Sequence, residues 1–239
     1  IAIETATEAC SAALLIHENG EQRIFKRFQL APREHTKLIL PMLDEVLDEA
    51  KLKLRDVDAI AFGRGPGAFT GLRIATGITQ GLALSVDKPT IPISSLHAMA
   101  LAAQKENSSN NKDTNFSIVV AIDARMSEVY WAEYEVNKGE LDQIGEEQLS
   151  QPAVIYEKTK SLMQSKKVIV IGSGWDVYLQ EFQNENSVVS ELTHLPKMFP
   201  DAEEISELAL LAFDKDELNS IEDAQPVYLR NNVAEKSKK

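Results

Sequence analysis

The first hundred residues combine strand-like and helix-like patterns of apolar positions. Three short runs separated by polar breaks predict consecutive antiparallel strands: 1–3, 12–16 and 23–30. Apolar residues then recur at steps of three and four from Arg33 to Ala50, which predicts an amphipathic helix. Val57–Phe62 and Thr90–Ile93 are typical of buried strands, and further helices are predicted over Leu72–Val86 and from Ser95 to about Gln104.

The second half of the chain repeats this outline. Ser117–Ile122 and Val129–Val136 flank a turn and predict a second meander. Two helices and a buried strand are predicted to follow: Val154–Gln164, Ala202–Asp214 and Val168–Ile171. Between the halves, Lys105–Asn115 contains no apolar residue and is predicted to be a linker. The chain is therefore predicted to be an α/β protein of two similar domains, residues 1–104 and 116–239.

The composition is globular with a strong acidic excess. The chain has 239 residues, with 25 Lys and Arg against 37 Asp and Glu, and this formal charge of -12 disfavours direct binding to nucleic acid. Any RNA-related role is therefore expected to depend on a partner protein that contacts the RNA. Cys10 is the only cysteine, so an internal disulfide is excluded and a reducing compartment is expected. Without an apolar run of 18 residues or a basic, apolar leader, we expect a cytoplasmic protein away from membranes.

A glycine-dense loop, Gly63–Arg73, separates a predicted strand from a predicted helix. Glycine lets the backbone approach a ligand closely, and free N–H groups at a helix start attract anions. The spacing departs from the dinucleotide and P-loop patterns, so a structural tight turn remains the alternative. The first strand-to-strand turn is predicted to contact the same phosphate. The alternative is that this turn is a solvated hairpin. A phosphate-binding loop, vestigial for a nucleotide, would comprise Glu4, Thr5, Thr7, Gly65, Gly67, Thr70 and Gly71.

Two further features admit a functional and a structural interpretation. Asp123 and Arg125 lie in the corresponding turn of the second half, where an aspartate is a base, a metal ligand or a turn cap. Gly77 and Gly81 stand one helical turn apart, and each lowers helix stability by about 0.8–1.0 kcal/mol relative to alanine. They indicate close packing against either the chain's own sheet or helix, or another subunit.

Histidine and serine positions give no pattern for a metal site or a hydrolase. No two of the four histidines are three or four residues apart, so a helical two-histidine site is not predicted and no metal is expected. Ser94, Ser95 and His97 lack a G-x-S-x-G elbow, and serines at a helix start are common caps.

Four segments resemble the signatures of the TsaB (YeaZ) family: IETATEACS at 3–11, GPGAFTGLR at 65–73, DARMSEVY at 123–130 and PVYLR at 226–230. The resemblance covers nearly the whole chain. It implies a duplicated actin-like fold of the acetate-kinase, sugar-kinase, Hsp70 and actin superfamily, related to ribonuclease H, with a degenerate second domain. It also implies a role in making threonylcarbamoyladenosine at position 37 of tRNAs that read codons beginning with A.

The resemblance further implies a non-catalytic subunit. The catalytic relative, TsaD, carries a His-x-x-x-His metal site where this chain has Ser95 and Met99, and Gly172–Trp175 is only a remnant of its second glycine motif. Neither side chain offers the imidazoles that hold iron or zinc. A pseudo-enzyme without catalytic residues, metal or cofactor is therefore expected, with weak nucleotide binding left open. The competing interpretations are a small-molecule kinase or ATPase of the same fold and, less favoured, a peptidase.

Partners are also expected from the resemblance. The family pairs with TsaD through the two helices of its first domain, forms homodimers when alone, works with the small ATPase TsaE, and meets tRNA only within the complex. The interface is expected to comprise His35, Leu38, Ile39, Met42 and Leu43 on the first helix and Arg73, Ile74, Gly77, Ile78 and Gly81 on the second.

Overall fold

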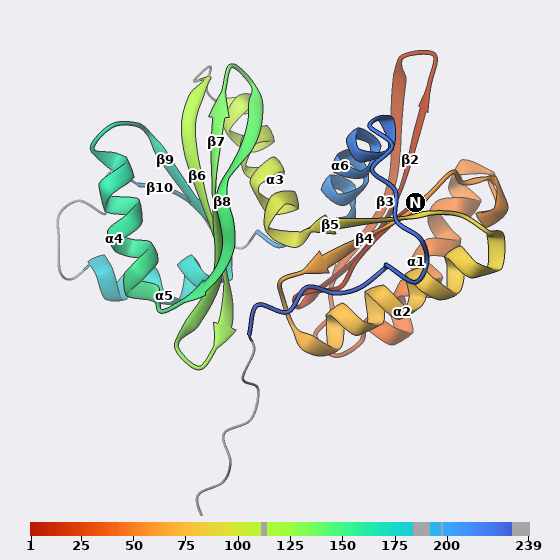
Figure 1. The fold of residues 1–239 in the computed structure, drawn as a ribbon, viewed down its shortest axis with the longest axis horizontal. Helices are drawn as coiled ribbons and strands as arrows, with labels where there is room; N and C mark the ends of the chain where they lie inside the picture. Colours follow the sequence, from red (N-terminus) through yellow and green to blue (C-terminus); the bar gives the residue numbers. More distant parts are fainter. Residues whose placement is uncertain (111–113, 184–191, 197, 231–239) are drawn as a thin grey trace, which may run out of the picture.

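The computed structural model describes residues 1–110, 114–183, 192–196 and 198–230. Two five-stranded sheets lie side by side, with helices on the outside of each and two more helices between them (Figure 1). None of the helices in these ranges combines the length and the hydrophobicity needed to cross a membrane.

The first sheet has the strand order β3-β2-β1-β4-β5. Its strands are β1 (Ala2–Glu4), β2 (Ala9–Glu18), β3 (Glu21–Leu30), β4 (Ile60–Gly65) and β5 (Thr90–Ser94). β1 to β3 form the predicted antiparallel meander, and β4 and β5 add to β1 in parallel. The parallel strands are connected through α1 (His35–Ala50), the short 3-10 helix η1 (Leu54–Asp56) and α2 (Phe69–Val86). The predicted strands and both helices of this half are confirmed.

The second sheet repeats this topology in the order β10-β9-β6-β7-β8. Its strands are β6 (Asn115–Arg125), β7 (Glu128–Asn137), β8 (Glu140–Ser150), β9 (Val168–Ile171) and β10 (Thr193–Leu195). Its helices are α4 (Pro152–Met163) and α5 (Ser173–Gln183), of which the sequence patterns predicted only the first. The predicted meander and the duplicated α/β fold are confirmed.

The two remaining helices cross over between the halves, which corrects the predicted domain boundary. α3 (Ser95–Asn110) follows the first sheet, but Leu96, Met99 and Ala103 are buried among apolar residues of the second sheet. α6 (Ala202–Asp214) follows the second sheet, but Ile205 and Leu208 are buried against strands of the first. In Figure 1 both helices lie between the sheets. Each half therefore completes its core with a helix from the other half of the sequence.

The predicted linker is wrong at residues 105–110, which form the last turns of α3, while 111–113 lie outside the described residues. Polar contacts explain why this stretch is helical without apolar residues. The Lys105 Nζ atom lies 2.7 Å from a carboxyl oxygen of Glu204 and 2.8 Å from one of Glu207, both on α6. Asn107 is buried and accepts a hydrogen bond from the Lys167 ammonium at 2.9 Å. These partners lie far away in sequence, so no local pattern predicts them.

Candidate functional site

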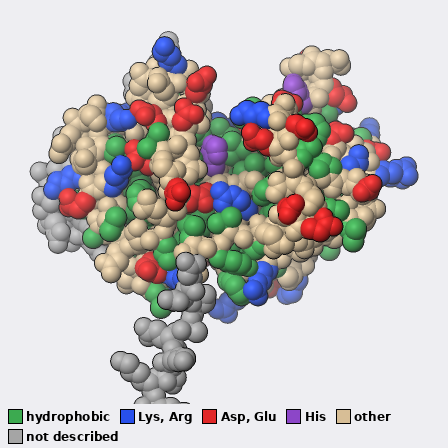
Figure 2. Space-filling view, in the orientation of Figure 1, with side chains coloured by type: hydrophobic (Ala, Val, Ile, Leu, Met, Phe, Trp, Pro, Cys, Tyr) green, Lys and Arg blue, Asp and Glu red, His purple; other side chains and the backbone are tan. Residues whose placement is uncertain are grey.

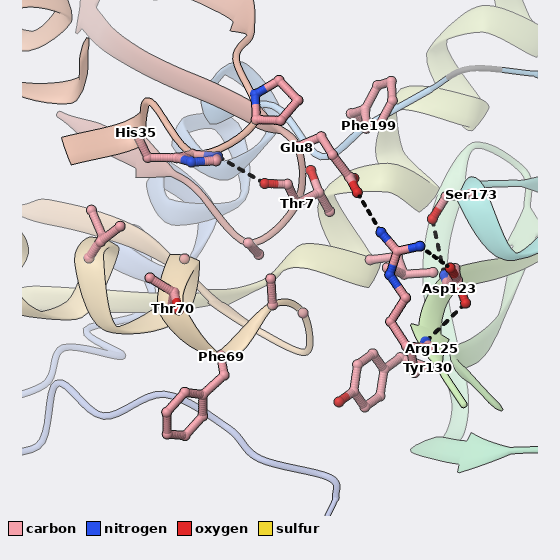
Figure 3. Close-up of a pocket in the computed structure, with 18 of the residues that line it drawn as sticks. Thr7, Glu8, His35, Phe69, Thr70, Asp123, Arg125, Tyr130, Ser173 and Phe199 are labelled. Atoms are coloured by element: carbon pink, nitrogen blue, oxygen red, sulfur yellow. Dashed lines mark hydrogen bonds and ion pairs between the residues drawn. The ribbon is translucent and has the colours of Figure 1, made fainter. Parts of the chain in front are cut away.

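A cleft of about 1200 Å³ lies between the two halves. One wall is formed by the turn after β1, the start of α1 and the loop before α2. The other is formed by the turn after β6 and the start of α5, and the C-terminal segment also contributes. Figure 3 shows Thr7, Glu8 and His35 on one side, and Asp123, Arg125 and Ser173 on the other. Clefts between domains are common ligand sites, which makes this one the candidate functional site.

The turn after β1 places two of the predicted phosphate-site residues in the core. Glu4 is fully buried; its Oε2 atom accepts a hydrogen bond from the Ser95 hydroxyl at 2.6 Å, and its Oε1 atom accepts one from the Ala6 N–H. Burial raises the pKa of the Glu4 carboxyl to about 7. Thr5 is also fully buried and donates to the Gly71 carbonyl at 2.8 Å. Neither side chain reaches the cleft.

The glycine-dense loop packs against this turn, which explains its composition. A Cβ atom at Gly63 would overlap the Glu4 carboxyl, one at Gly67 would overlap Ala6, and one at Gly71 would overlap the Thr5 carbonyl. The close approach that glycine permits is therefore made to the chain's own backbone and buried carboxyl. The structural interpretation of the loop accounts for these three glycines.

Only part of the predicted phosphate loop faces the cleft. Thr7, Gly67, Thr70 and Gly71 line it, whereas Glu4, Thr5 and Gly65 are not among its lining residues. Gly65 has a φ of +96° at the end of β4, a backbone conformation that favours glycine for a turn. The prediction of Glu4, Thr5 and Gly65 as ligand contacts is therefore corrected for this cleft.

In the second half, the turn after β6 is stabilised by its own aspartate. The Asp123 carboxyl accepts a hydrogen bond from the Arg125 N–H at 3.0 Å, so the turn-cap interpretation accounts for this residue. Arg125, Met126 and Ser127 have φ values of 63°, 58° and 56°, three successive left-handed residues that are not glycine. The Arg125 guanidinium lies 3.3 Å from the Asp123 carboxyl and 3.3 Å from that of Glu8 across the cleft (Figure 3).

A second ion pair, partly buried, joins the halves. The two terminal nitrogens of Arg64 on β4 each lie 3.1 Å from a carboxyl oxygen of Glu147 on β8, whose side chain is 6% exposed. His97 lies nearby and stacks on Tyr134 at 5.2 Å between ring centroids. Burial, with a smaller effect from Arg64, lowers the pKa of His97 to about 4. His97 is therefore neutral near pH 7 and belongs to the packed junction between the halves.

The C-terminal segment connects α2 to the second half (Figure 1). Gln80 donates to the Ala224 carbonyl at 2.9 Å, and Arg73 donates to the Tyr228 hydroxyl at 3.2 Å. Further along, Arg230 pairs with Glu128 at 2.5 Å. Figure 2 shows hydrophobic side chains gathered at the surface where this segment meets the start of α2. The sequence patterns did not predict this role, because the segment is neither periodic nor apolar.

Four of the predicted interface residues on α1 are buried. Ile39, Met42 and Leu43 pack in the core of the first half, and the His35 Nε2 atom lies 2.9 Å from the Thr7 carbonyl and 3.1 Å from the Ala9 carbonyl. These residues are covered by the chain itself, so the interface prediction is corrected for them. Leu38 is half-buried, and Leu40, absent from the predicted set, is 47% exposed.

The outer face of α2 fits the interface prediction better. Five of its exposed residues recur at steps of three and four: Thr70, Arg73, Gly77, Gly81 and Leu84. Leu84 is 72% exposed, and Ile74 and Ile78 beside the stripe are half-buried. A Cβ atom at Gly77 or Gly81 would meet nothing within 4 Å. Packing against the chain's own sheet or helices therefore does not account for these two glycines.

The serines at the start of α3 have structural roles. The Ser94 hydroxyl accepts a hydrogen bond from the His97 N–H at 3.1 Å, which caps the helix, and Ser95 contacts Glu4. The capping prediction is confirmed for Ser94. In the part of the chain that the structure describes, no three His, Cys, Asp or Glu side chains are grouped as a metal ion would require.

Comparisons with known proteins agree with this architecture. The family model described as TsaD, tRNA N6-adenosine threonylcarbamoyltransferase, matches residues 28–238. Two relatives are each named tRNA threonylcarbamoyladenosine biosynthesis protein TsaB. The Escherichia coli K12 protein is 40% identical over 235 residues, covering 98% of this chain and 95% of the relative. The Haemophilus influenzae protein is 41% identical over 238 residues, covering 98% and 94%.

A solved structure of YeaZ from Pseudomonas aeruginosa superimposes with a TM-score of 0.78 at 38% identity, covering 95% of this chain and 98% of that one. A tRNA N6-adenosine threonylcarbamoyltransferase from Porphyromonas gingivalis matches more locally, at 33% identity over 43% of this chain and 33% of the relative. The chain therefore belongs to the TsaB (YeaZ) family and has the actin-like α/β fold of the wider TsaD group.

Proposed function

We propose that the chain is a non-catalytic subunit that docks on a TsaD-type transferase during tRNA threonylcarbamoyladenosine synthesis. The names of its full-length relatives support the process. The docking face is the exposed stripe of α2 from Thr70 to Leu84, with Leu40 of the neighbouring α1. This face replaces the predicted one, in which four of the ten residues are buried.

The observation that carries the proposal is the open space at Gly77 and Gly81. Two mid-helix glycines destabilise α2, and no internal contact in the described structure accounts for them. Glycines on an exposed helix face allow the backbone of a partner helix to approach closely. Leu84, three residues after Gly81 on the same helix, and Leu40 on α1 are large apolar side chains open to solvent, which a partner would cover.

The non-catalytic part of the proposal is supported by the side chains at the positions that match the transferase's metal motif. Ser95 and Met99 are both buried, and the Ser95 hydroxyl is engaged by the Glu4 carboxyl. The relatives that match over the full length are named biosynthesis proteins, whereas the transferase matches over a third of its own length.

We also propose the remaining partners that the family resemblance implies. Alone, the chain would use the α2 face for a homodimer that competes with the transferase, since an isologous contact buries the same residues on both copies. The family's ATPase, TsaE, would join the heterodimer. The formal charge of -12 favours contact with tRNA only within the complex.

The test is size-exclusion chromatography with light scattering on the chain mixed with the TsaD protein of its own organism. We expect a heterodimer with the native chain, and at least a roughly tenfold loss of affinity for Gly77→Leu and Gly81→Leu, because the added bulk blocks helix approach. Ser161→Leu, at an exposed position on α4, is the matched control and should bind like the native chain. Equal binding by all variants would contradict the proposed face.

A separate assay addresses the enzyme alternatives. The isolated chain should hydrolyse neither ATP nor peptides above the rate of a blank. A rate that survives repurification and changes with substitutions lining the cleft would contradict the non-catalytic role and support a kinase or ATPase of this fold.

A further inference from the structure

The turn after β6 holds a methionine that is open to solvent. The Met126 side chain is 74% exposed. The other four methionines of the chain are less accessible, the first two buried and the last two half-buried: Met42, Met99, Met163 and Met198. A thioether is oxidised only where the oxidant reaches the sulfur, so exposure should direct oxidation to Met126.

The backbone fixes the position of this side chain. Met126 is the second of three successive left-handed residues that are not glycine, with a φ of 58°. This conformation costs free energy and persists only where neighbouring groups enforce it. Two contacts to Arg125 do so: its N–H donates to the Asp123 carboxyl at 3.0 Å, and its carbonyl accepts from Arg230 at 3.3 Å. The thioether is therefore presented to solvent at a defined place.

A guanidinium group lies against the sulfur. The Arg230 Nη1 atom lies 3.7 Å from the Met126 Sδ atom, while its Nη2 atom lies 2.5 Å from a carboxyl oxygen of Glu128. A thioether is a weak hydrogen-bond acceptor, so the contact with sulfur contributes little to holding Arg230. Oxidation makes this side chain polar, and the sulfoxide oxygen would accept a charge-assisted hydrogen bond from the same guanidinium.

Arg230 is one of two points that hold the C-terminal segment. The Val227 N–H donates to the Arg64 carbonyl on β4 at 2.8 Å, and Arg230, three residues later, pairs with Glu128 on β7. The segment is thus held to the first half at Val227 and to the second half at Arg230. A stronger contact at Arg230 should make release of the whole segment rarer.

We propose that Met126 is a peroxide-sensitive modification site whose sulfoxide fastens the C-terminal segment to the second half. A lone pair on the sulfur attacks one oxygen of hydrogen peroxide, and the S–O bond forms as the O–O bond breaks. The departing hydroxide takes the proton of the transferred hydroxyl and leaves as water. The sulfur is oxidised and the peroxide is reduced. A thiol-dependent sulfoxide reductase would restore the thioether.

The site assignment is tested by peptide mass spectrometry of the full chain after brief treatment with hydrogen peroxide. We expect Met126 to be oxidised at least roughly tenfold faster than Met42 and Met99, because those two side chains are buried. In urea the rates should become similar, because all the sulfurs are then exposed. Equal rates in the folded protein would overturn the assignment.

Hydrogen exchange of the Val227 amide tests the consequence. In the oxidised native chain it should be at least roughly threefold slower than in the untreated chain, because release of the segment then also breaks the new hydrogen bond. Met126→Gln, whose amide oxygen is a permanent acceptor, should slow the exchange without peroxide. Met126→Leu is the matched control: it keeps an apolar side chain, and its exchange should not respond to peroxide.

Arg230→Ala separates the oxidation from its consequence. Met126 should still be oxidised in this variant, but exchange at Val227 should not slow, because the guanidinium is missing. Unchanged or faster exchange in the oxidised native chain would overturn the proposed role of the sulfoxide, and so would equal slowing in Arg230→Ala. Thermal unfolding of each variant confirms that it is folded.

Discussion

The two halves of the molecule share one strand order but differ at the turn that follows their first strand. After β1, the Glu4 carboxyl is buried and bonded to Ser95 and the Ala6 N–H. At the end of β6, the Asp123 carboxyl faces the cleft and contacts Arg125. The two copies of the fold therefore share a backbone path, but the acidic side chain is buried in the first copy and faces the cleft in the second.

The glycines of the two halves differ in the same way. In α5 of the second half, a Cβ atom at Gly174 would lie 3.0 Å from Ala121 and Val129, so this glycine serves internal packing. In α2 of the first half, Gly77 and Gly81 face open space. A helical glycine therefore indicates close approach, but the structure has to show whether the neighbour is the chain itself or something outside it.

The largest expected effect tests whether the glycine loop is an internal packing feature. Gly71→Ala should lower the free energy of unfolding by at least about 3 kcal/mol, because the Thr5 carbonyl, a backbone group, has to move. Gly174→Ala, its counterpart in the second half, should cost only about 1–2 kcal/mol, since its neighbours lie 3.0 Å away. Urea unfolding followed by circular dichroism measures both free energies. Equal losses for the two variants would show that Gly71 is no more tightly packed than Gly174.

The next effect sharpens the contrast between the two acidic turns. Because the pKa of Glu4 is raised to about 7 in the folded protein, the folded state binds more protons than the unfolded state between pH 4.5 and 7. The free energy of unfolding should therefore fall as the pH rises through this range, by up to about 3 kcal/mol, and then level off.

Glu4→Gln is the matched variant, because the amide keeps the acceptor for Ala6 and still bonds to Ser95. The difference in unfolding free energy between the native chain and this variant should change with pH from 4.5 to 7. Parallel stability curves for the two proteins would show that Glu4 does not titrate in this environment.

The smallest expected effect is a gain in stability, whereas the substitutions at Gly71 and Gly174 should lower it. Gly77→Ala should raise the free energy of unfolding of the isolated chain by about 0.8–1.0 kcal/mol, because alanine favours the helix and its Cβ atom meets nothing. The same variant should bind the transferase more weakly than the native chain. Urea unfolding and light scattering measure the two effects, and a variant that is less stable would indicate an internal contact at this glycine.

Much of the fold could be predicted because the local pattern agrees with the tertiary structure. The α2 helix was predicted over all but its first three residues, and α6 over its whole length from Ala202 to Asp214. The α5 helix was missed, although Trp175 and Leu179 lie one turn apart and are buried. The adjacent Gly172 and Gly174 masked this signal, because glycine is usual in loops.

The sequence by itself determined most of the strands and helices, the duplication and the family, since these depend on residues close together in the chain. Tertiary structure decided which neighbour covers each apolar face. Periodicity marks Ile39 and Gly77 alike as contact positions, yet only the folded chain shows that one is buried and the other open. It also decided the charge of the cleft, because four arginines from distant segments meet only when the two halves pack together.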